Sequence, residues 1–215
     1  MSKRQRNADT TREAILDAAE AIFAREGFAG ARVDNIAELS TYNKSLIFQY
    51  FGDKTGLYVA VIRRLRVRSS QHLLAVLAEF CNVTMDKQTV RHLLETLIGA
   101  SFDYLAANPN QRAMTAWDIA EGWRSLGDIT PTPEEDELNA LLGTLLTRAR
   151  ASGALHPALN ATAIVLHALG LCVNYLATLP RSQRLNPQEP LDTPEKLADA
   201  RQQIITLLLD GALVK

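Results

Sequence analysis

Polar side chains that hydrogen-bond well to nucleic acid are concentrated between residues 33 and 51. They are Asn43, Lys44, Ser45, Gln49 and Tyr50. A lysine donates to guanine O6 and N7, a glutamine can pair with adenine through two hydrogen bonds, and Ser and Tyr hydroxyls suit phosphate oxygens. This set of side chains predicts contacts to the bases and backbone of duplex DNA.

Two short apolar patterns flank these residues and would position them. The polar pair Ser40-Thr41 separates the two patterns. The first consists of Val33, Ile36, Ala37 and Leu39, and the second consists of Ile47 and Phe51. Two short helices joined by a tight turn are the geometry of a helix-turn-helix, in which the second helix enters the major groove. We expect Ile36, Ala37, Ile47 and Phe51 to lock the helices together. By itself this pattern also occurs in helical proteins that do not bind DNA.

Helices are predicted on both sides of this segment. Thr10 and Glu13 form a capping-box pattern at the start of a helix that extends to Glu26, and Gly27 would end it in a left-handed conformation. Asp53 would cap a helix that runs from Lys54 towards Phe80. The arginine cluster of this helix, between Arg63 and Arg68, would pair with acidic side chains of the following domain or add to the positive field near DNA.

The remaining chain predicts further helices and no strands, so the expected fold class is all-α. The expected helices cover residues 87–107, 111–126, 134–150, 161–179 and 194–213. The apolar segment 161–179 is interpreted as a buried core helix and not as a membrane span.

Charge and cysteine usage favour a soluble intracellular protein. Residues 1–68 contain 12 Lys+Arg and 8 Asp+Glu, a balance of +4, whereas residues 69–215 contain 11 and 16, a balance of −5. A basic first part beside an acidic second part suits a polyanion-binding head on a larger body. Cys81 and Cys172 lack CxxC spacing, which favours neither a disulfide framework nor zinc, and the N-terminus lacks a signal peptide's apolar stretch. We expect a cytoplasmic location.

The acidic second part of the chain, residues 69–215, contains aromatic residues that could line a ligand pocket. The candidates are Phe102, Trp117, Trp123, His167 and Tyr175. Core packing is the alternative for each of them. The histidines show no paired metal spacing, and there is no phosphate loop or nucleophile elbow, so neither a metal site, a cofactor nor an enzyme is expected.

The stretch IAELSTYNKSLIFQYFGDKTGLY, residues 36–58, resembles the DNA-binding head of the TetR-type transcriptional regulators. The resemblance extends over about residues 10–65. It implies phosphate contacts from Tyr50 and Lys54, and groove-facing positions at Tyr42, Asn43, Lys44, Ser45 and Gln49. Three positions depart from the family pattern. Arg32 replaces a capping Thr and could reach a phosphate, Thr41 replaces the turn Gly and could alter the turn, and Phe48 replaces a Tyr and lacks its hydroxyl.

The resemblance also implies the organisation of the whole chain. We expect a three-helix DNA-binding domain over residues 1–54 and a larger helical ligand-binding and dimerisation domain over residues 55–215, linked by the helix from residue 54. Helices 161–179 and 194–213 would form a homodimer interface. The expected function is repression at a palindromic operator of double-stranded DNA, released by a small apolar or amphipathic effector, with no membrane association. The alternatives are a helical enzyme, or a ligand-binding or scaffolding protein with a vestigial DNA-binding head.

Overall fold

The computed structural model of the chain describes residues 3–122, 130–158, 160–188 and 190–213. These residues form helices and no strand, although a single β-bridge pairs Leu155 with Leu213. The all-α prediction is confirmed. The helices are α1 (Lys3–Gly30), α2 (Val33–Ser40), α3 (Lys44–Phe51), α4 (Lys54–Leu77), the 3-10 turn η1 (Ala78–Phe80), α5 (Lys87–Ala107), α6 (Pro109–Ala120), α7 (Pro133–Ala151), α8 (Ala161–Leu185) and α9 (Pro194–Ala212).

The helices form two compact units. The smaller unit comprises Met1–Val67 and Ala113–Thr130, and the larger unit comprises Arg68–Arg112 and Pro131–Lys215. This division differs from the expected boundary after residue 54, because the first turns of α4 belong to the smaller unit. Leu57, Val61 and Leu65 of α4 are buried in that unit's hydrophobic core, and Met114 of α6 lies in the same core.

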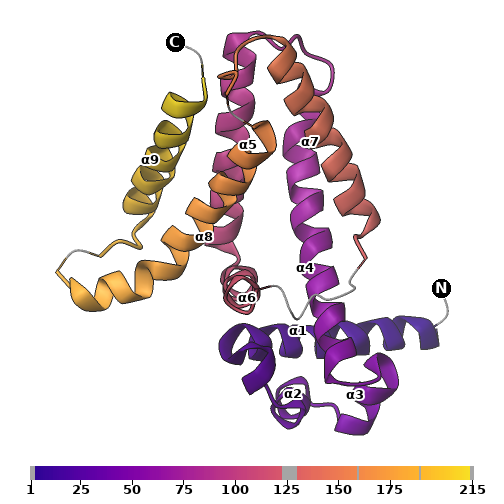
Figure 1. Cartoon of the computed structure of the whole chain (residues 1–215). Coiled ribbons are helices and arrows are strands. Elements are labelled where there is room, and N and C mark those ends of the chain that lie inside the picture. The colour runs from indigo at the N-terminus through magenta and orange to yellow at the C-terminus, as the bar shows by residue number, and fades with distance from the viewer. Residues whose placement is uncertain (1–2, 123–129, 159, 189, 214–215) are drawn as a thin grey trace. The chain divides into compact units, whose positions relative to one another are not determined.

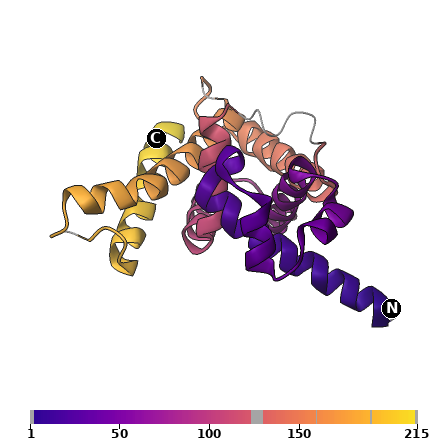
Figure 2. The same cartoon turned by 90° about the horizontal axis from the view of Figure 1, so that it is seen from below.

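Helix α1 is the longest element of the smaller unit, and α2 and α3 lie on one side of it (Figure 1). Because α1 begins at Lys3, Thr10 lies inside the helix, and the predicted helix start at Thr10 is wrong. Figure 2 shows the first turns of α1 projecting beyond the other helices of this unit. Gly27 has φ +68° and ψ 175° and breaks the helix, as its position predicts.

One arginine ties α4 to α1. The guanidinium of Arg64 lies 3.1 Å from a carboxylate oxygen of Glu13, 2.7 Å from Asp17 and 2.6 Å from Glu20. These three acids follow one face of α1, at the i, i+4 and i+7 positions. The expectation that this cluster pairs with acids of the following domain is therefore wrong for Arg64, which binds the first helix of the chain instead.

The second half of α6 packs into the smaller unit through two adjacent residues. The indole N–H of Trp117 donates to the carbonyl of Ala24 at 3.2 Å, and its ring lies against Gly27. The hydroxyl of Tyr58 donates to a carboxylate oxygen of Asp118 at 2.8 Å, and both side chains are buried. Burial raises the pKa of the Asp118 carboxyl, and the hydrogen bond from Tyr58 opposes that effect. Sequence reasoning gave no indication that this distant segment belongs with α1 and α4.

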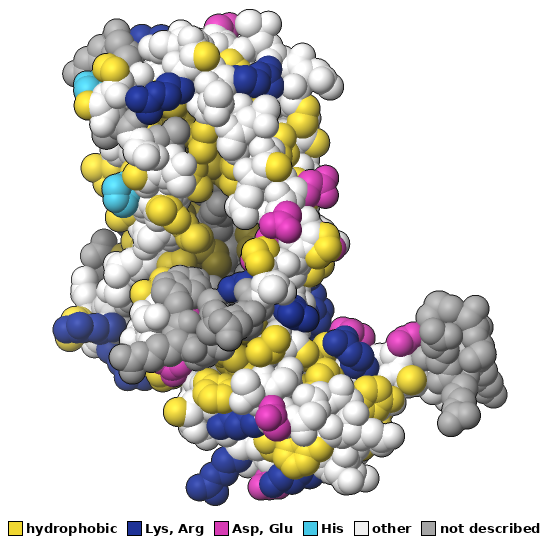
Figure 3. Space-filling view, turned by 45° about the vertical axis from the view of Figure 1, so that its right-hand side comes forward, with side chains coloured by type: hydrophobic (Ala, Val, Ile, Leu, Met, Phe, Trp, Pro, Cys, Tyr) yellow, Lys and Arg dark blue, Asp and Glu magenta, His cyan; other side chains and the backbone are white. Residues whose placement is uncertain are grey.

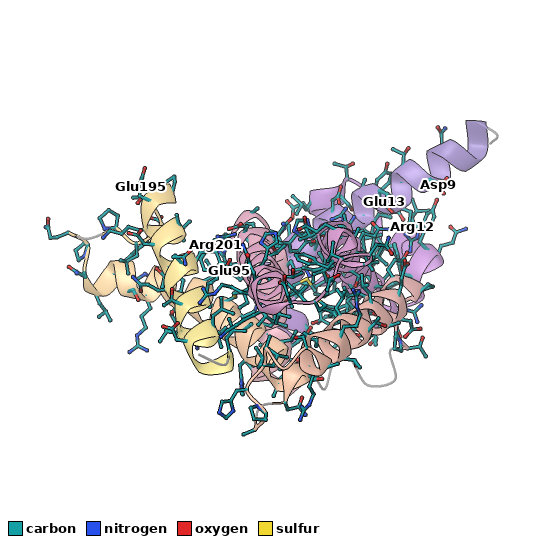
Figure 4. All side chains as sticks on the ribbon, turned by 90° about the horizontal axis from the view of Figure 1, so that it is seen from above. Asp9, Arg12, Glu13, Glu95, Glu195 and Arg201 are labelled. Carbon is teal, nitrogen blue, oxygen red and sulfur yellow. The ribbon has the colours of Figure 1, made fainter. Side chains whose placement is uncertain are left out.

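The larger unit packs α5, α7, α8 and α9 around one hydrophobic core. Arg201 of α9, labelled in Figure 4, lies over α5 and donates to Asp103 at 3.0 Å. Helix α7 begins with a capping box between Thr132 and Glu135. Thr193 caps α9, as its place before Pro194 predicts.

Helix α8 is longer than expected. It continues through Pro180 to Leu185 instead of ending at Leu179, and Figure 1 shows that it changes direction along its length. A proline inside a helix removes one backbone hydrogen bond and bends the helix without having to end it. By length and composition, Thr162–Leu185 could also cross a membrane, although 33% of its apolar window is buried in this structure. Cys172 and Leu176 contribute to the core of the larger unit, but most of the apolar window is not buried, so the expectation of a buried core helix is met on one face of α8 only.

Candidate nucleic-acid interface

Helices α2 and α3 form the expected helix-turn-helix. Ile36 of α2 and Ile47 of α3 are fully buried, and Ala37 and Phe51 pack against the same core. The four residues predicted to lock the helices together therefore share one cluster. Burying one face of each short helix leaves the opposite face of α3 free to contact DNA.

The turn between the helices keeps a left-handed residue although a threonine occupies the position. Thr41 has φ 63° and ψ 13°, and its N–H donates to the carbonyl of Glu38 at 3.3 Å. The expected change of the turn at Thr41 is not observed, because the backbone adopts the conformation that a glycine would adopt there. A β-branched residue in this region carries strain of about 1 to 2 kcal/mol.

The two residues that precede these helices have different roles. Asn43 caps α3, since its side-chain oxygen accepts from the N–H of Leu46 at 2.8 Å. Arg32 precedes α2 and makes no side-chain capping hydrogen bond, and its side chain is exposed. Asn43 thus stabilises the start of α3, whereas Arg32 is exposed to solvent at the start of α2.

The outer face of α3, called the reading face below, is formed by residues at helical spacing. Lys44, Ser45, Phe48 and Gln49 are exposed, whereas Ile47 on the opposite face is buried. The Lys44 ammonium lies 3.0 and 3.2 Å from the two carboxylate oxygens of Asp34 in α2. Both partners are exposed, so the pair is screened by water and contributes at most about 1 kcal/mol. Lys44 can therefore leave Asp34 for a base at small cost.

Tyr42, Tyr50 and Lys54 lie at the margin of this face and are half-buried. The Tyr42 hydroxyl accepts a long hydrogen bond of 3.5 Å from Thr11, and Tyr50 packs beside Phe51 with ring centroids 6.1 Å apart. The Lys54 ammonium donates to the carbonyl of Ala29 at 3.3 Å and lies 4.8 Å from the ring centroid of Phe28.

Residue types and spacing identified most of this face but not Phe48. An apolar residue on a short helix is usually assigned to the core, and only the exposure of its side chain, at 36%, shows that it lies outside. The signal available in the sequence was its position one turn after Lys44, on the same helix face.

The expected ligand-binding residues do not gather at one place. Phe102 and Tyr175 lie together in the larger unit, with ring centroids 6.1 Å apart, and burial raises the pKa of the Tyr175 hydroxyl. His167 is exposed on α8. Trp117 belongs to the smaller unit, and Trp123 lies outside the described residues.

Comparison with known proteins agrees with this architecture. Residues 15–61 match the family model of bacterial regulatory proteins of the tetR family, and residues 91–208 match the model of the Tetracyclin repressor-like C-terminal domain. The chain is 32% identical over 106 residues to the HTH-type transcriptional repressor NicS of Pseudomonas putida, covering 49% of this chain and 47% of NicS. It is 36% identical over 93 residues to the HTH-type transcriptional regulator RutR of Escherichia coli, covering 43% and 44%. The chain thus spans about half the length of the curated relatives it matches.

Solved structures show the same fold over nearly the whole chain. The transcriptional regulator FadR from Bacillus subtilis, in complex with stearoyl-CoA, superposes with a TM-score of 0.63 at 18% identity, covering 93% of this chain and 98% of that one. The regulator SCO4942 from Streptomyces coelicolor gives a TM-score of 0.61 at 23% identity, covering 94% and 98%. At these identities the likeness concerns the fold.

A helix-turn-helix with an exposed polar reading face, in a chain whose other compact unit is helical, defines the class of helix-turn-helix regulatory proteins. The two family models together place the chain within it: the protein belongs to the tetR family of bacterial regulatory proteins.

Proposed function

We propose that this protein is a transcriptional repressor that binds a palindromic operator as a homodimer and releases it when a small apolar or amphipathic effector binds the larger unit. The observation that carries the proposal is the two-faced character of α3. Its inner side is locked by the buried Ile47, and its outer side presents Lys44, Ser45 and Gln49 to solvent. This arrangement suits side chains that read base edges in the major groove.

The expected DNA contacts fall into two kinds. Lys44 and Gln49 lie on the exposed face of α3 and would read bases. Arg32, Tyr50 and Lys54 lie beside it and would hold phosphates, in keeping with a positioning role that carries no sequence information. The relatives NicS and RutR are named as a repressor and a regulator of the HTH type, which supports the same class of function.

A random-site selection with the purified protein tests the proposal, because a dimer with two equivalent reading helices must enrich a palindrome. On the selected site, Lys44→Ala should cost about 1 to 3 kcal/mol and relax the preference at one position. Lys54→Ala should weaken all sequences similarly and reduce the salt slope by about one. Asp34→Asn is the matched control, because it frees Lys44 without removing it and should preserve the preference.

The same experiment separates the proposal from its alternatives. Failure to enrich any site at low salt would favour a ligand-binding protein whose head no longer binds DNA. Equal salt slopes and unchanged preference in the two lysine variants would contradict the assigned roles. Turnover of a co-purified molecule would favour an enzyme, whereas the relatives' names support a transcriptional regulator. A cytoplasmic location belongs to the same proposal.

The dimer is supported by exposed leucines on α8 and α9. Leu166 is 64% exposed, Leu169 is 42% exposed and Leu207 is 72% exposed. Apolar surface of this kind on the two helices expected at the interface is suited to a second copy of the chain. Leu166→Glu and Leu207→Glu should yield monomers in sedimentation equilibrium. Val83→Glu is a matched control, because Val83 is also exposed, at 39%, but lies outside these helices.

The effector would bind within the larger unit. Figure 3 shows hydrophobic side chains along a hollow in the face of this unit. The FadR structure contains stearoyl-CoA, a molecule with an apolar chain, and it has the same fold. Native mass spectrometry of the purified protein should detect the molecule that it retains from the cell. Adding that molecule should weaken operator binding, and binding to operator should weaken its affinity by the same factor. An operator affinity that is unchanged at saturating ligand would contradict the proposed release.

A further inference from the structure

Phe48 lies on the exposed reading face of α3, outside the hydrophobic core cluster of the smaller unit. Its side chain is 36% exposed, while the preceding Ile47 is fully buried. Tyr50 and Phe51, the other aromatic residues of α3, pack against the core of the smaller unit, but Phe48 is not part of that cluster. Packing against the core of the smaller unit therefore accounts for Tyr50 and Phe51 but not for Phe48.

Phe48 lies one helical turn after Lys44, and the two side chains are in contact range. The Lys44 ammonium lies 5.9 Å from the centroid of the Phe48 ring, within the range of a cation–π interaction. The ring thus stands beside the residue best suited to read guanine in the major groove. Figure 3 shows hydrophobic surface among the Lys, Arg and acidic side chains at the lower end of the view.

The major groove offers one apolar group to such a ring, which is the C5-methyl of thymine. We propose that Phe48 is a specificity-determining residue that contacts a thymine methyl in each operator half-site. Because the ring centroid and the Lys44 ammonium are 5.9 Å apart, and base pairs rise about 3.4 Å per step, the thymine lies within about two steps of the base that Lys44 reads. The inference rests on the proposed function, since it requires an operator.

A phenylalanine suits this contact better than a tyrosine in one respect. The ring carries no hydroxyl that must keep a hydrogen bond when water is excluded from the groove, so its whole edge can lie against the methyl group. The contact would distinguish thymine from cytosine, which presents an N4 amino group and no methyl.

The test replaces thymine by uracil in the selected operator, one symmetry-related pair at a time, because uracil lacks only the C5-methyl. At the pair that Phe48 contacts, the wild-type protein should bind about fourfold more weakly per methyl removed, or about sixteenfold when both half-sites are changed. Phe48→Ala should bind the thymine and uracil operators equally. Phe48→Tyr keeps the ring and should keep the preference for thymine.

Lys44→Ala is the matched control on the same face, because it should lose the guanine preference yet retain the thymine-to-uracil ratio. Circular dichroism should show that Phe48→Ala still unfolds in one cooperative transition, since the removed ring lies outside the core cluster of the smaller unit. Tight binding of the operator with no uracil effect at any position would overturn the inference and leave the proposed function standing. A uracil effect that survives in Phe48→Ala would also overturn it. Failure of the wild type to select any site would overturn the proposed function itself.

Discussion

Substitution of Gly27 by alanine is expected to destabilise the smaller unit, for two reasons that can be separated. Its φ of +68° and ψ of 175° lie in a region that only glycine adopts readily, so alanine there carries about 1 to 3 kcal/mol of strain. A Cβ at Gly27 would also meet three ring atoms of Trp117 at 3.1, 3.3 and 3.3 Å. Overpacking of this kind costs about 1 to 3 kcal/mol.

The expected net effect of Gly27→Ala is a loss of about 3 kcal/mol in unfolding free energy. This sum takes about 2 kcal/mol for strain and about 2 kcal/mol for the contact, less about 0.5 to 1 kcal/mol because alanine restricts the unfolded chain. Gly122 is a matched control, since its φ is +63° but no atom lies within 4 Å of the position that a Cβ would take there. Gly122→Ala should therefore cost only about 1 kcal/mol, from strain alone.

Urea unfolding followed by circular dichroism at 222 nm gives both values. The decisive comparison repeats Gly27→Ala in a Trp117→Leu background, where the flat ring is gone and the alanine methyl has room. There its penalty should fall to about that of Gly122→Ala, a coupling of about 2 kcal/mol. A penalty that is the same in both backgrounds would refute the packing of Trp117 on Gly27. It would also refute the assignment of this half of α6 to the smaller unit.

Three further predictions concern single residues. Asp118→Asn should stabilise the protein at neutral pH, because its amide oxygen still accepts from Tyr58 and no buried charge remains. Burial raises the folded-state pKa of Asp118 above its usual value of 3.8, so the wild type loses stability as the pH rises from 3.8 through the folded-state pKa. The stability advantage of Asp118→Asn should therefore shrink on acidification. An advantage that is the same in urea titrations at pH 7.5 and pH 4.5 would contradict this. Thr41→Gly should raise the unfolding free energy by about 0.5 to 1 kcal/mol. It removes about 1 to 2 kcal/mol of left-handed backbone strain, and the added conformational entropy of the unfolded chain offsets only part of this gain. A lower melting temperature for the variant would contradict this. Cys172 is buried, and burial raises its pKa to about 11, whereas Cys81 is exposed. In native protein at pH 7.5, iodoacetamide should therefore react with Cys172 far more slowly than with Cys81. Equal labelling rates would contradict the burial of Cys172 in the core of the larger unit.

The helices of the larger unit were largely predictable because their ends are marked locally. The helix over residues 87–107 has the expected bounds, and Thr193 before Pro194 marks the start of α9. Asp53 likewise caps α4, accepting from the N–H of Gly56 at 2.7 Å. A cap acts within four residues, so a short stretch of sequence contains the information that determines it.

The features that sequence reasoning missed depend on contacts between distant residues. Nothing near Trp117 or Asp118 in the chain indicates that their partners are Ala24 and Tyr58, which lie 93 and 60 residues away. The exposure of Phe48 likewise depends on which side of α3 the rest of the unit covers. The N-terminal extension of α1 has a different cause, because the helix runs through the capping pattern at Thr10 and begins seven residues earlier, at Lys3.

The break in α1 at Gly27 connects these separate observations. Carbonyl groups close to a helix break or helix end are available to donors from elsewhere, and two of those in α1 accept from other parts of the smaller unit. The indole of Trp117 donates to Ala24 and the ammonium of Lys54 donates to Ala29, so α6 and the start of α4 are both tied to the same end of α1. Lys54 immediately follows the turn after α3, so a side chain expected to hold a phosphate also contacts the end of α1. Because this hydrogen bond is exposed and 3.3 Å long, the Lys54 ammonium can leave the Ala29 carbonyl for a phosphate at small cost.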